Sequence, residues 1–210
     1  MRLVATDLEI ARGEEIILTG VNLHVGSGES LVVTGPNGGG KSTLLRALAG
    51  LLPLRHGRVS IEQADGSPSA DLGSAVHYLG HENAMKADIS TGDNLAFWHN
   101  LGPDPHLTPE EALDMVGLGG LDAVPFGHLS TGQRRRAAIA RLLVTWRPVW
   151  LLDEPTAGLD AASQAGFSEL VAAHLDDGGI VVAATHVPLG IVTPAELNVA
   201  DFAPAHLPLP

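Results

Sequence analysis

The sequence predicts an α/β fold built around a parallel sheet, with a helical lobe inserted into it. Residues 30–34 form a short β-branched run that stops at a glycine-rich loop, and an apolar helical stretch follows at 43–48, which together make a strand–loop–helix unit. The runs 149–152 and 180–184 are typical of fully buried parallel strands, and a helical pattern at 161–175 lies between them. Strands that alternate with helices in this way indicate a parallel sheet.

The N-terminal part of the chain adds an antiparallel portion to this core. Segments 3–10 and 16–25 show partial alternation of apolar and polar residues, with a turn-prone Arg12-Gly13 pair between them. We therefore expect two antiparallel strands joined by a short turn.

The middle of the chain predicts the helical lobe. The residue pattern of 88–147 is mainly helical. Thr108, Pro109 and the two glutamates that follow are typical of a helix start, with Thr108 as the N-cap. Residues 203–210 are too rich in proline for regular secondary structure. The predicted parts of a single domain are a core of 1–87 and 148–192, a lobe of 88–147 and a C-terminal tail of 193–210.

Composition excludes several classes of protein. The 12 lysine and arginine residues stand against 24 aspartate and glutamate residues, and this net charge of −12 argues against a protein that binds nucleic acid through a general basic surface. Because the chain has no cysteine, a disulfide scaffold, a cysteine-ligated metal site and thiol catalysis are excluded. No stretch approaches the roughly 18 uninterrupted apolar residues of a membrane-spanning helix, so we expect any membrane role to come through a partner.

The loop after the strand at 30–34 fits the phosphate-binding pattern G-x-x-x-x-G-K-[ST]. Glycines let successive backbone N–H groups turn inward around phosphates, and the next helix directs its positive end at the same point. We expect Lys41 to reach the β- and γ-phosphates and the Ser42 hydroxyl to bind Mg²⁺; the alternative is a glycine-rich hairpin with a chance Lys-Ser pair. The predicted nucleotide-binding residues here are Gly35, Pro36, Asn37, Gly38, Gly39, Gly40, Lys41, Ser42 and Thr43.

Two carboxylates follow the buried strand at 149–152, at the edge of a parallel sheet where ligands bind. We expect Asp153 to hold Mg²⁺ directly or through water, and Glu154 to polarise an attacking water. A helix-capping turn is the alternative for both acids. His186 follows the strand at 180–184 at the same edge, and we expect it to contact a γ-phosphate, although a histidine after a strand is more often structural.

The stretch L-S-T-G-Q, followed by three arginines, resembles the L-S-G-G-Q signature of the ATP-binding cassette ATPases. The family's other motifs occur in its usual order: 35–42 resembles Walker A, 151–154 Walker B, 157–160 the D-loop and 185–186 the switch histidine. This resemblance implies a RecA-like P-loop NTPase core with an N-terminal antiparallel β-subdomain and the family's inserted helical lobe. It also implies an ATPase that uses ATP and Mg²⁺.

The family binds ATP between two cassettes arranged head to tail. The resemblance therefore implies that Ser130 and Gly132 of one copy contact the γ-phosphate held by the P-loop of a second copy, a contact that closes because it occurs twice about a two-fold axis. The implied signature residues are Leu129, Ser130, Thr131, Gly132 and Gln133, and the implied D-loop residue is Asp160.

A finer resemblance narrows the family. Residues 77–86, with a Tyr-Leu-Gly-His stretch, together with 93–98, 132–135 and 185–189, are similar to the ATP-binding subunits of cytochrome c maturation systems, the haem-exporter ATPases. This implies a peripheral subunit on the cytoplasmic face of the inner membrane, bound to integral membrane permease subunits. ATP hydrolysis would serve haem export or the release of a haem-loaded chaperone. The alternatives are an exporter of another substrate, a soluble cassette acting on nucleic acid or the ribosome, and a nucleotide-gated scaffold without turnover.

Three positions depart from the family's pattern. No glutamine matches the Q-loop, and His81 or Glu82 stands in its place as the candidate nucleotide contact. No aromatic residue precedes the P-loop to stack on adenine; the planar guanidinium of Arg12 is the candidate, with a solvent-facing turn as the alternative. Thr131 replaces a glycine, so we expect an ordinary negative φ there.

Three weaker patterns have mainly structural interpretations. The ten histidines are dispersed, so we expect scattered surface residues and no direct binding of haem. The arginines at 134–136 and Arg141 are expected to pair with acids across the lobe or to flank the nucleotide, and not to bind nucleic acid. Met85, Phe97 and Trp98 are candidates for a pocket that receives a coupling helix of a membrane partner; a core position for at least two of them is the alternative.

Overall fold

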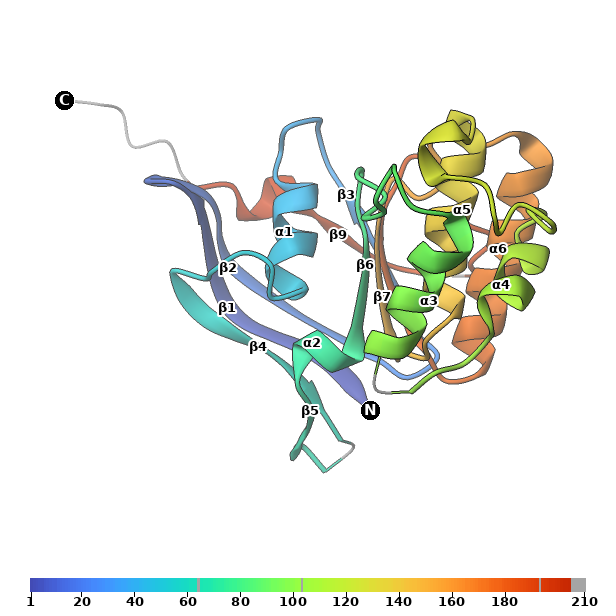
Figure 1. The fold of residues 1–210 in the computed structure, drawn as a ribbon. Helices are drawn as coiled ribbons and strands as arrows, with labels where there is room; N and C mark the ends of the chain where they lie inside the picture. The colour runs from blue at the N-terminus through green and yellow to red at the C-terminus, as the bar shows by residue number, and fades with distance from the viewer. Residues whose placement is uncertain (64, 103, 193, 205–210) are drawn as a thin grey trace.

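The computed structural model describes residues 1–63, 65–102, 104–192 and 194–204, and it has the predicted α/β architecture (Figure 1). An antiparallel sheet lies on one side, a parallel sheet stands in the middle, and helix α1 (Lys41–Leu48) is enclosed between the two. Helices α3 to α6 cover the opposite face of the parallel sheet. The site discussed below lies at the carboxyl ends of the parallel strands.

The antiparallel sheet has the strand order β2-β1-β4-β5. Its strands are β1 (Arg2–Arg12), β2 (Glu15–Gly26), β4 (His56–Glu62) and β5 (Pro68–Ala70). The two predicted strands are confirmed, and they pair antiparallel with Leu3 opposite Val25. The strands β4 and β5 were not predicted, because no clear apolar alternation marks either segment.

The parallel sheet has the order β6-β7-β8-β3-β9, and each neighbouring pair is parallel. Its strands are β3 (Ser30–Thr34), β6 (Val76–Leu79), β7 (Val149–Asp153), β8 (Ile180–Ala184) and β9 (Ala195–Asn198). All residues of β7 and β8 are buried, which confirms the prediction of two fully buried strands. Along β7, side chains alternate between two cores, since Leu151 packs with α1 and Trp150 with the helical lobe.

The structure differs from the expectation that residues 193–210 form a tail outside the core. Strand β9 joins the parallel sheet beside β3, with Leu197 opposite Val33 and buried. A short 3₁₀ helix, η2 (Val199–Phe202), follows and places Val199 in the core. A four-residue strand with one buried apolar side chain leaves too weak a pattern to detect in the sequence. Most of the proline-rich end, 205–210, lies outside the described residues.

The inserted lobe is helical, as predicted. It contains α3 (Thr91–Leu101), α4 (Pro109–Met115), the 3₁₀ helix η1 (Phe126–His128) and α5 (Thr131–Leu143). Thr108 caps α4 and forms a capping box with Glu111, which confirms the predicted helix start. The remaining helices are α2 (Leu72–Ala75) and α6 (Ala161–Asp176). Within the described part of the chain, no helix has both the length and the apolar character needed to cross a membrane.

Candidate functional site

The carboxyl ends of β3 and β7 bring the predicted phosphate loop and the two predicted carboxylates to one cavity. This cavity has a volume of about 220 Å³. It is lined by Arg12, Asn37, Gly38, Gly40, Lys41, Ser42, Thr43, Asp153 and Glu154. Residues more than 110 positions apart in sequence therefore share one site, because β3 and β7 both pair with β8.

Two positions of the phosphate loop have backbone conformations that favour glycine over residues with a Cβ. Gly35 and Gly40 have φ angles of 129° and 102°. A Cβ on Gly35 would lie 2.6 Å from Val199 Cγ2, and one on Gly40 would lie 2.9 Å from Ile17 Cγ2. Gly40 is the N-cap of α1 and offers no side-chain cap, so the first-turn amides of α1 are left for a ligand.

Lys41 lies over this loop. Its Nζ donates to the carbonyl oxygens of Gly35 at 2.9 Å and Pro36 at 3.0 Å. The ammonium group is therefore held at the cavity that the loop surrounds, within reach of anionic groups that enter it.

Asp153 is almost fully buried at the end of β7 and belongs to a chain of polar side chains. Tyr78, from the neighbouring strand β6, donates its hydroxyl to Asp153 Oδ2 at 3.3 Å, and Arg46 Nε of α1 donates to the Tyr78 oxygen at 3.4 Å. Burial raises the pKa of Tyr78, so its hydroxyl stays protonated and serves as a donor. Neither Tyr78 nor Arg46 was predicted as a site residue, since contacts between strands leave no mark in local sequence.

Glu154 lines the cavity and faces His186, which is not among the residues that line it. His186 Nε2 lies 3.8 Å from Glu154 Oε1, and both side chains are partly exposed. Glu154 has a φ of 45°, in the left-handed region that side chains with a Cβ avoid at a cost of about 1–2 kcal/mol. Its amide donates to the carbonyl of Ala184 at 2.8 Å, which ties the turn after β7 to the end of β8.

The signature residues form the start of α5. Ser130 is the N-cap: its Oγ accepts from the Gln133 amide, and Gln133 Oε1 accepts from the Ser130 amide, which makes a capping box. Thr131, at the first helical position, is not among the non-glycine residues with positive φ, as predicted. A Cβ on Gly132 would lie 3.4 Å from the carbonyl of Gly158, so the signature adjoins the D-loop of its own chain. The cavity lining of the described chain includes no signature residue.

Asp160 of the D-loop caps the next helix. Its Oδ1 accepts from the Ser163 amide at 2.8 Å, and this bond lowers the pKa of Asp160. His81 and Glu82 are both exposed after the end of β6, and neither is among the residues lining the cavity. Arg12 does line the cavity, as do Asn37 and Gly38 of the phosphate loop.

The arginines of α5 bind backbone carbonyls and not acids, and pairing with acids was one of the two roles that the sequence predicted for them, the other being to flank the nucleotide. Among the described residues, no salt bridge involves them. Strand β6 is at the edge of the parallel sheet, and arginines bind carbonyls in it and directly after it: Arg147 donates to Val76, Arg141 to Tyr78 and Arg135 to Gly80. Arg134 donates to the carbonyl of Leu129. The expectation of acid pairs was wrong because it overlooked the unpaired carbonyls of an edge strand.

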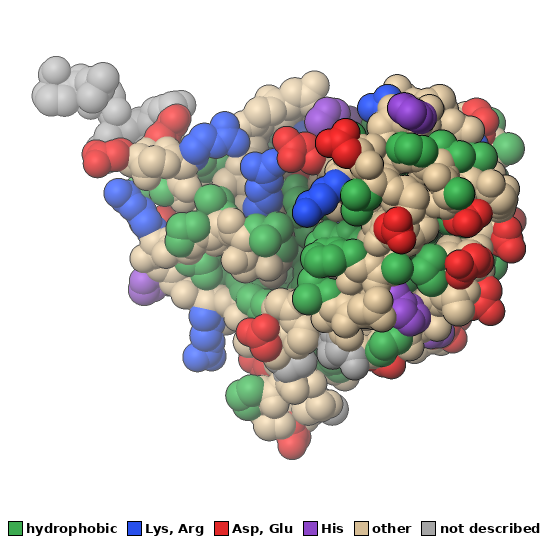
Figure 2. Space-filling view, viewed as in Figure 1, with side chains coloured by type: hydrophobic (Ala, Val, Ile, Leu, Met, Phe, Trp, Pro, Cys, Tyr) green, Lys and Arg blue, Asp and Glu red, His purple; other side chains and the backbone are tan. Residues whose placement is uncertain are grey.

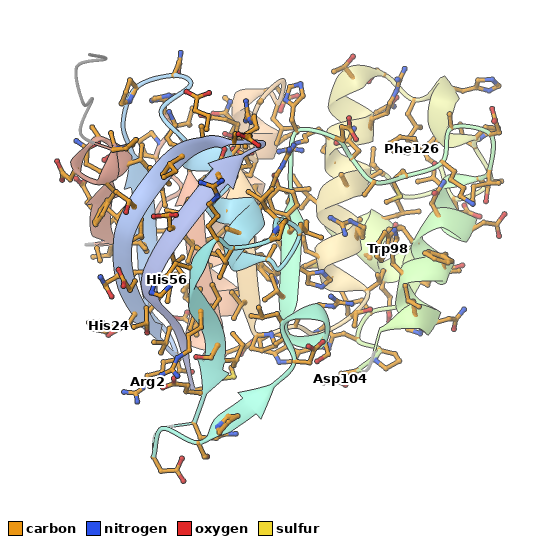
Figure 3. The ribbon with its side chains drawn as sticks, turned by 90° about the vertical axis from the view of Figure 1, so that its left-hand side faces the viewer. Arg2, His24, His56, Trp98, Asp104 and Phe126 are labelled. Carbon is orange, nitrogen blue, oxygen red and sulfur yellow. The ribbon has the colours of Figure 1, made fainter. Side chains whose placement is uncertain are left out.

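The histidines are dispersed, but two of them are not on the surface. His77 and His174 are each only 3% exposed, which corrects the prediction of surface positions. His174 stacks on Trp150 with ring centres 4.0 Å apart. His24 and His56, in contrast, lie exposed on the antiparallel sheet (Figure 3). No group of three or more histidine, cysteine, aspartate or glutamate side chains suited to a metal ion occurs within the described ranges.

Comparison with known proteins assigns the site to a family. A family model described as "ABC transporter" matches residues 18–157, which is more than half of the chain and includes the phosphate loop, the signature and both carboxylates. The chain belongs to the ABC transporter family. As a member of this family it is an ATP-binding subunit and an ATPase.

Two curated relatives match nearly the whole length of this ABC ATPase. The cytochrome c biogenesis ATP-binding export protein CcmA of Chelativorans sp. is 56% identical over 198 residues, covering 94% of this chain and 98% of its own. The protein with the same name from Mesorhizobium japonicum is 58% identical over 191 residues, covering 91% and 94%. Among solved structures, a dimeric ATP-binding cassette in a post-hydrolysis state with ADP and Pi has a TM-score of 0.76, 26% identity and 88% coverage of both chains.

Proposed function

We propose that this chain is the ATP-hydrolysing subunit of an ABC complex for c-type cytochrome biogenesis. The observation that carries the proposal is the single cavity that holds the P-loop lysine and serine together with Asp153 and Glu154. The long, highly identical match to cytochrome c biogenesis export proteins supports the cellular process.

The chain's own groups divide the work at this cavity. The P-loop amides and the Lys41 ammonium bind the β- and γ-phosphates, and Arg12 stacks on the adenine. Glu154 accepts a proton from the water that attacks the γ-phosphorus, and the bond from that phosphorus to the β–γ bridging oxygen breaks to give ADP and phosphate. His186, beside Glu154, contacts the γ-phosphate on the side where the attacking water binds. General-base assistance of this kind accelerates a reaction by about 10²–10⁴-fold.

The residues present fit a magnesium ion carried by the nucleotide. Ser42 and Asp153 line the same cavity and offer one hydroxyl and one carboxylate. Mg²⁺ takes few protein oxygens and completes its shell with phosphate oxygens and water, so two donors suit it. When bound, it neutralises charge on the phosphate oxygens.

The signature residues complete the site from a second copy of the chain. They lie at the N-terminus of α5, where the helix presents free amides, and are absent from the chain's own cavity lining within the described residues. A head-to-tail pair places Ser130 and Gly132 of each copy at the P-loop of the other. The similar cassette of known structure is itself dimeric.

A groove on another face suits a membrane partner. It has a volume of about 300 Å³ and is lined by the segment that follows α1 and by residues of α2, β6 and the lobe, among them Leu51, Leu72, Trp98, Arg141 and Arg147. Figure 2 shows hydrophobic side chains gathered in a hollow between the part of the surface that carries α1 and α2 and the part that carries α3. We propose that a cytoplasmic helix of the integral membrane subunits docks here, which places this chain on the cytoplasmic face of the inner membrane.

Of the three residues predicted to form a docking pocket, Trp98 lines this groove, whereas Met85 and Phe97 are not among its lining residues. Trp98 and Met85 are partly buried against the lobe core, and Arg141 lies 4.8 Å from the centre of the Trp98 ring. Phe97 is 57% exposed and packs edge-on against Trp98 with ring centres 5.5 Å apart, so it is available to a partner next to the groove. We expect no direct contact with haem, and no change in the haem absorption spectrum on addition of this protein would support that expectation.

The proposal is tested with the chain and its partners purified together from detergent-solubilised membranes. We expect cytochrome c maturation membrane proteins in the complex, and ATPase activity that is lost in Glu154→Gln. Co-purification with a different permease would support the ATPase mechanism and show that the complex serves another substrate. The absence of any membrane partner, with tight binding to RNA at physiological salt, would favour a soluble cassette. Retention of full activity in Glu154→Gln would refute the assigned base.

A further inference from the structure

Arg135, in the second turn of α5, binds more backbone groups than any other site residue described above. The residue is only 5% exposed. Nε donates to the carbonyl of Pro155 at 2.8 Å and Nη1 to that of Gly80 at 2.7 Å. Nη2 donates to the carbonyls of Glu154 at 2.8 Å and Asp153 at 3.2 Å. The guanidinium thus holds four carbonyls with a planar set of donors that no other side chain offers.

These carbonyls come from two loops of the α/β core, whereas Arg135 belongs to the helical lobe. Gly80 directly follows β6 and precedes His81 and Glu82, in the place of the Q-loop. The Asp153 carbonyl is at the end of β7, and those of Glu154 and Pro155 belong to the turn that follows it. One buried side chain of the lobe therefore fixes both loops of the core at once. Arg135 is also near the negative charges of Asp153 and Glu154, which favour its charged form, although burial lowers its pKa.

The turn that Arg135 holds is the strained one. Glu154 has a φ of 45°, and such a conformation persists only where the surroundings determine it. The Glu154 amide is bound by the Ala184 carbonyl, and the Glu154 carbonyl is bound by Arg135. With both backbone groups held, the Cα–Cβ bond of Glu154 has a set direction, and from there its Oε1 lies 3.8 Å from His186 Nε2.

We propose that Arg135 is a positioning residue that sets the Glu154 carboxylate for proton abstraction and links its alignment to the orientation of the helical lobe. The inference rests on the proposed function of Glu154. Ser130 and Gly132 stand at the start of the same helix, one turn before Arg135. When a second copy engages this end of α5, any shift of the helix moves the guanidinium against the Glu154 carbonyl. Through the Arg135 side chain, binding of a second copy at the signature residues therefore affects how Glu154 activates water.

The first test compares Arg135→Gln with Arg136→Gln in the full chain with its membrane partners. Arg136 is the matched control because it lies on the same helix and its guanidinium also donates to two carbonyls, but those of Val116 and Gly117, both within the lobe. We expect Arg135→Gln to lower kcat by about 10- to 100-fold with the KM for ATP changed less than about threefold, because misplacement of a catalytic group affects the chemical step. The kcat of Arg135→Lys should lie between those of the unaltered protein and Arg135→Gln, since an ammonium cannot span all four carbonyls. Equal losses in Arg135→Gln and Arg136→Gln, or no loss in Arg135→Gln, would overturn the proposal.

Guanidinium rescue separates positioning from general stability. In folded Arg135→Ala protein, guanidinium ion at concentrations far below those that unfold proteins should restore part of the lost kcat, and should leave Arg136→Ala unchanged. Rescue that is equal in both variants, or absent in folded Arg135→Ala, would contradict positioning through the four carbonyls.

Hydrogen exchange tests the same contact without any need for turnover. We expect faster amide exchange at residues 80–84 and 153–157 in Arg135→Gln than in Arg136→Gln, at equal global stability. Unchanged exchange in those segments would overturn the proposal. If the unaltered complex hydrolyses no ATP while this exchange difference is present, the proposed function is refuted, but the structural role of Arg135 in holding the two loops is supported.

Discussion

Two buried histidines make the stability of the chain dependent on pH. Burial, with the nearby Arg141 charge, lowers the pKa of His77 to about 3, and burial lowers the pKa of His174 to about 4. Both values lie below the ordinary pKa of about 6.5. Between the folded-state pKa values and about pH 6.5, the unfolded chain therefore binds more protons than the folded chain. Stability is therefore complete above about pH 6.5 and is lost as the pH falls toward the folded-state values.

The size of the loss follows from these pKa values. Between pH 6.5 and about pH 5 each histidine titrates almost only in the unfolded chain, and 1.36 kcal/mol per pH unit over about 1.5 units gives about 2 kcal/mol. Together, His77 and His174 should lower the free energy of unfolding by about 4 kcal/mol between about pH 7.5 and about pH 5. Urea unfolding, followed by circular dichroism at both pH values, measures this difference.

Matched variants isolate the two side chains. His77→Gln keeps a donor for the Thr145 carbonyl, which His77 Nε2 contacts at 2.9 Å. His174→Phe keeps an aromatic ring against Trp150 and removes two ring nitrogens that have no hydrogen-bond partner. The double variant should lose less than about 1 kcal/mol over the same interval, and His24→Gln, at an exposed position, should behave as the unaltered chain. A double variant that loses as much stability as the unaltered chain would refute the reasoning.

Three further changes have defined outcomes. Glu154→Gln should lower the ATPase kcat by about 10²–10⁴-fold while ATP still binds, which activity and equilibrium binding assays together would show; weakened binding with normal kcat would contradict the assigned role. Arg12→Ala should weaken ATP affinity by about three- to thirtyfold through loss of stacking on adenine, and an unchanged affinity in a fluorescent-nucleotide titration would favour a solvent-facing turn. Phe167→Ala should lower the free energy of unfolding by about 3–5 kcal/mol, because Phe167 is only 2% exposed; a loss below about 1 kcal/mol would show that its pocket collapses around the smaller side chain.

The parts of the site that the sequence predicted are contiguous in the chain. The P-loop spacing, and the acids that end a buried strand, each report on one strand and the loop after it. The order of buried strands then predicts that these loops meet at one edge of the sheet, and the cavity that contains Lys41, Ser42, Asp153 and Glu154 has this arrangement. The antiparallel pair β1–β2 and the helix start at Thr108 were predicted for the same reason, since turn and capping signals are local.

The parts that sequence reasoning missed depend on contacts between distant segments. The Tyr78 hydroxyl reaches Asp153 only because β6 lies beside β7. Arg135 has the same residue type as its neighbours, and only the packing of α5 along the free edge of β6 shows that it binds the Glu154 turn. His174 is polar in the sequence, but the structure buries it against Trp150. No local pattern carries this information, because tertiary neighbours determine it.

The shared, head-to-tail ATP site is tested most directly by thiol crosslinking, for which the absence of cysteine in the chain leaves a clean background. One preparation carries Asn37→Cys at the P-loop and the other Thr131→Cys at the signature, both exposed positions, in a Glu154→Gln background that retains ATP. A short bis-thiol reagent should join the two chains with MgATP, and should not join them with ADP or when Lys41→Ala is added. No crosslink in protein that has bound ATP, or the same yield without nucleotide, would contradict a site completed by a second copy.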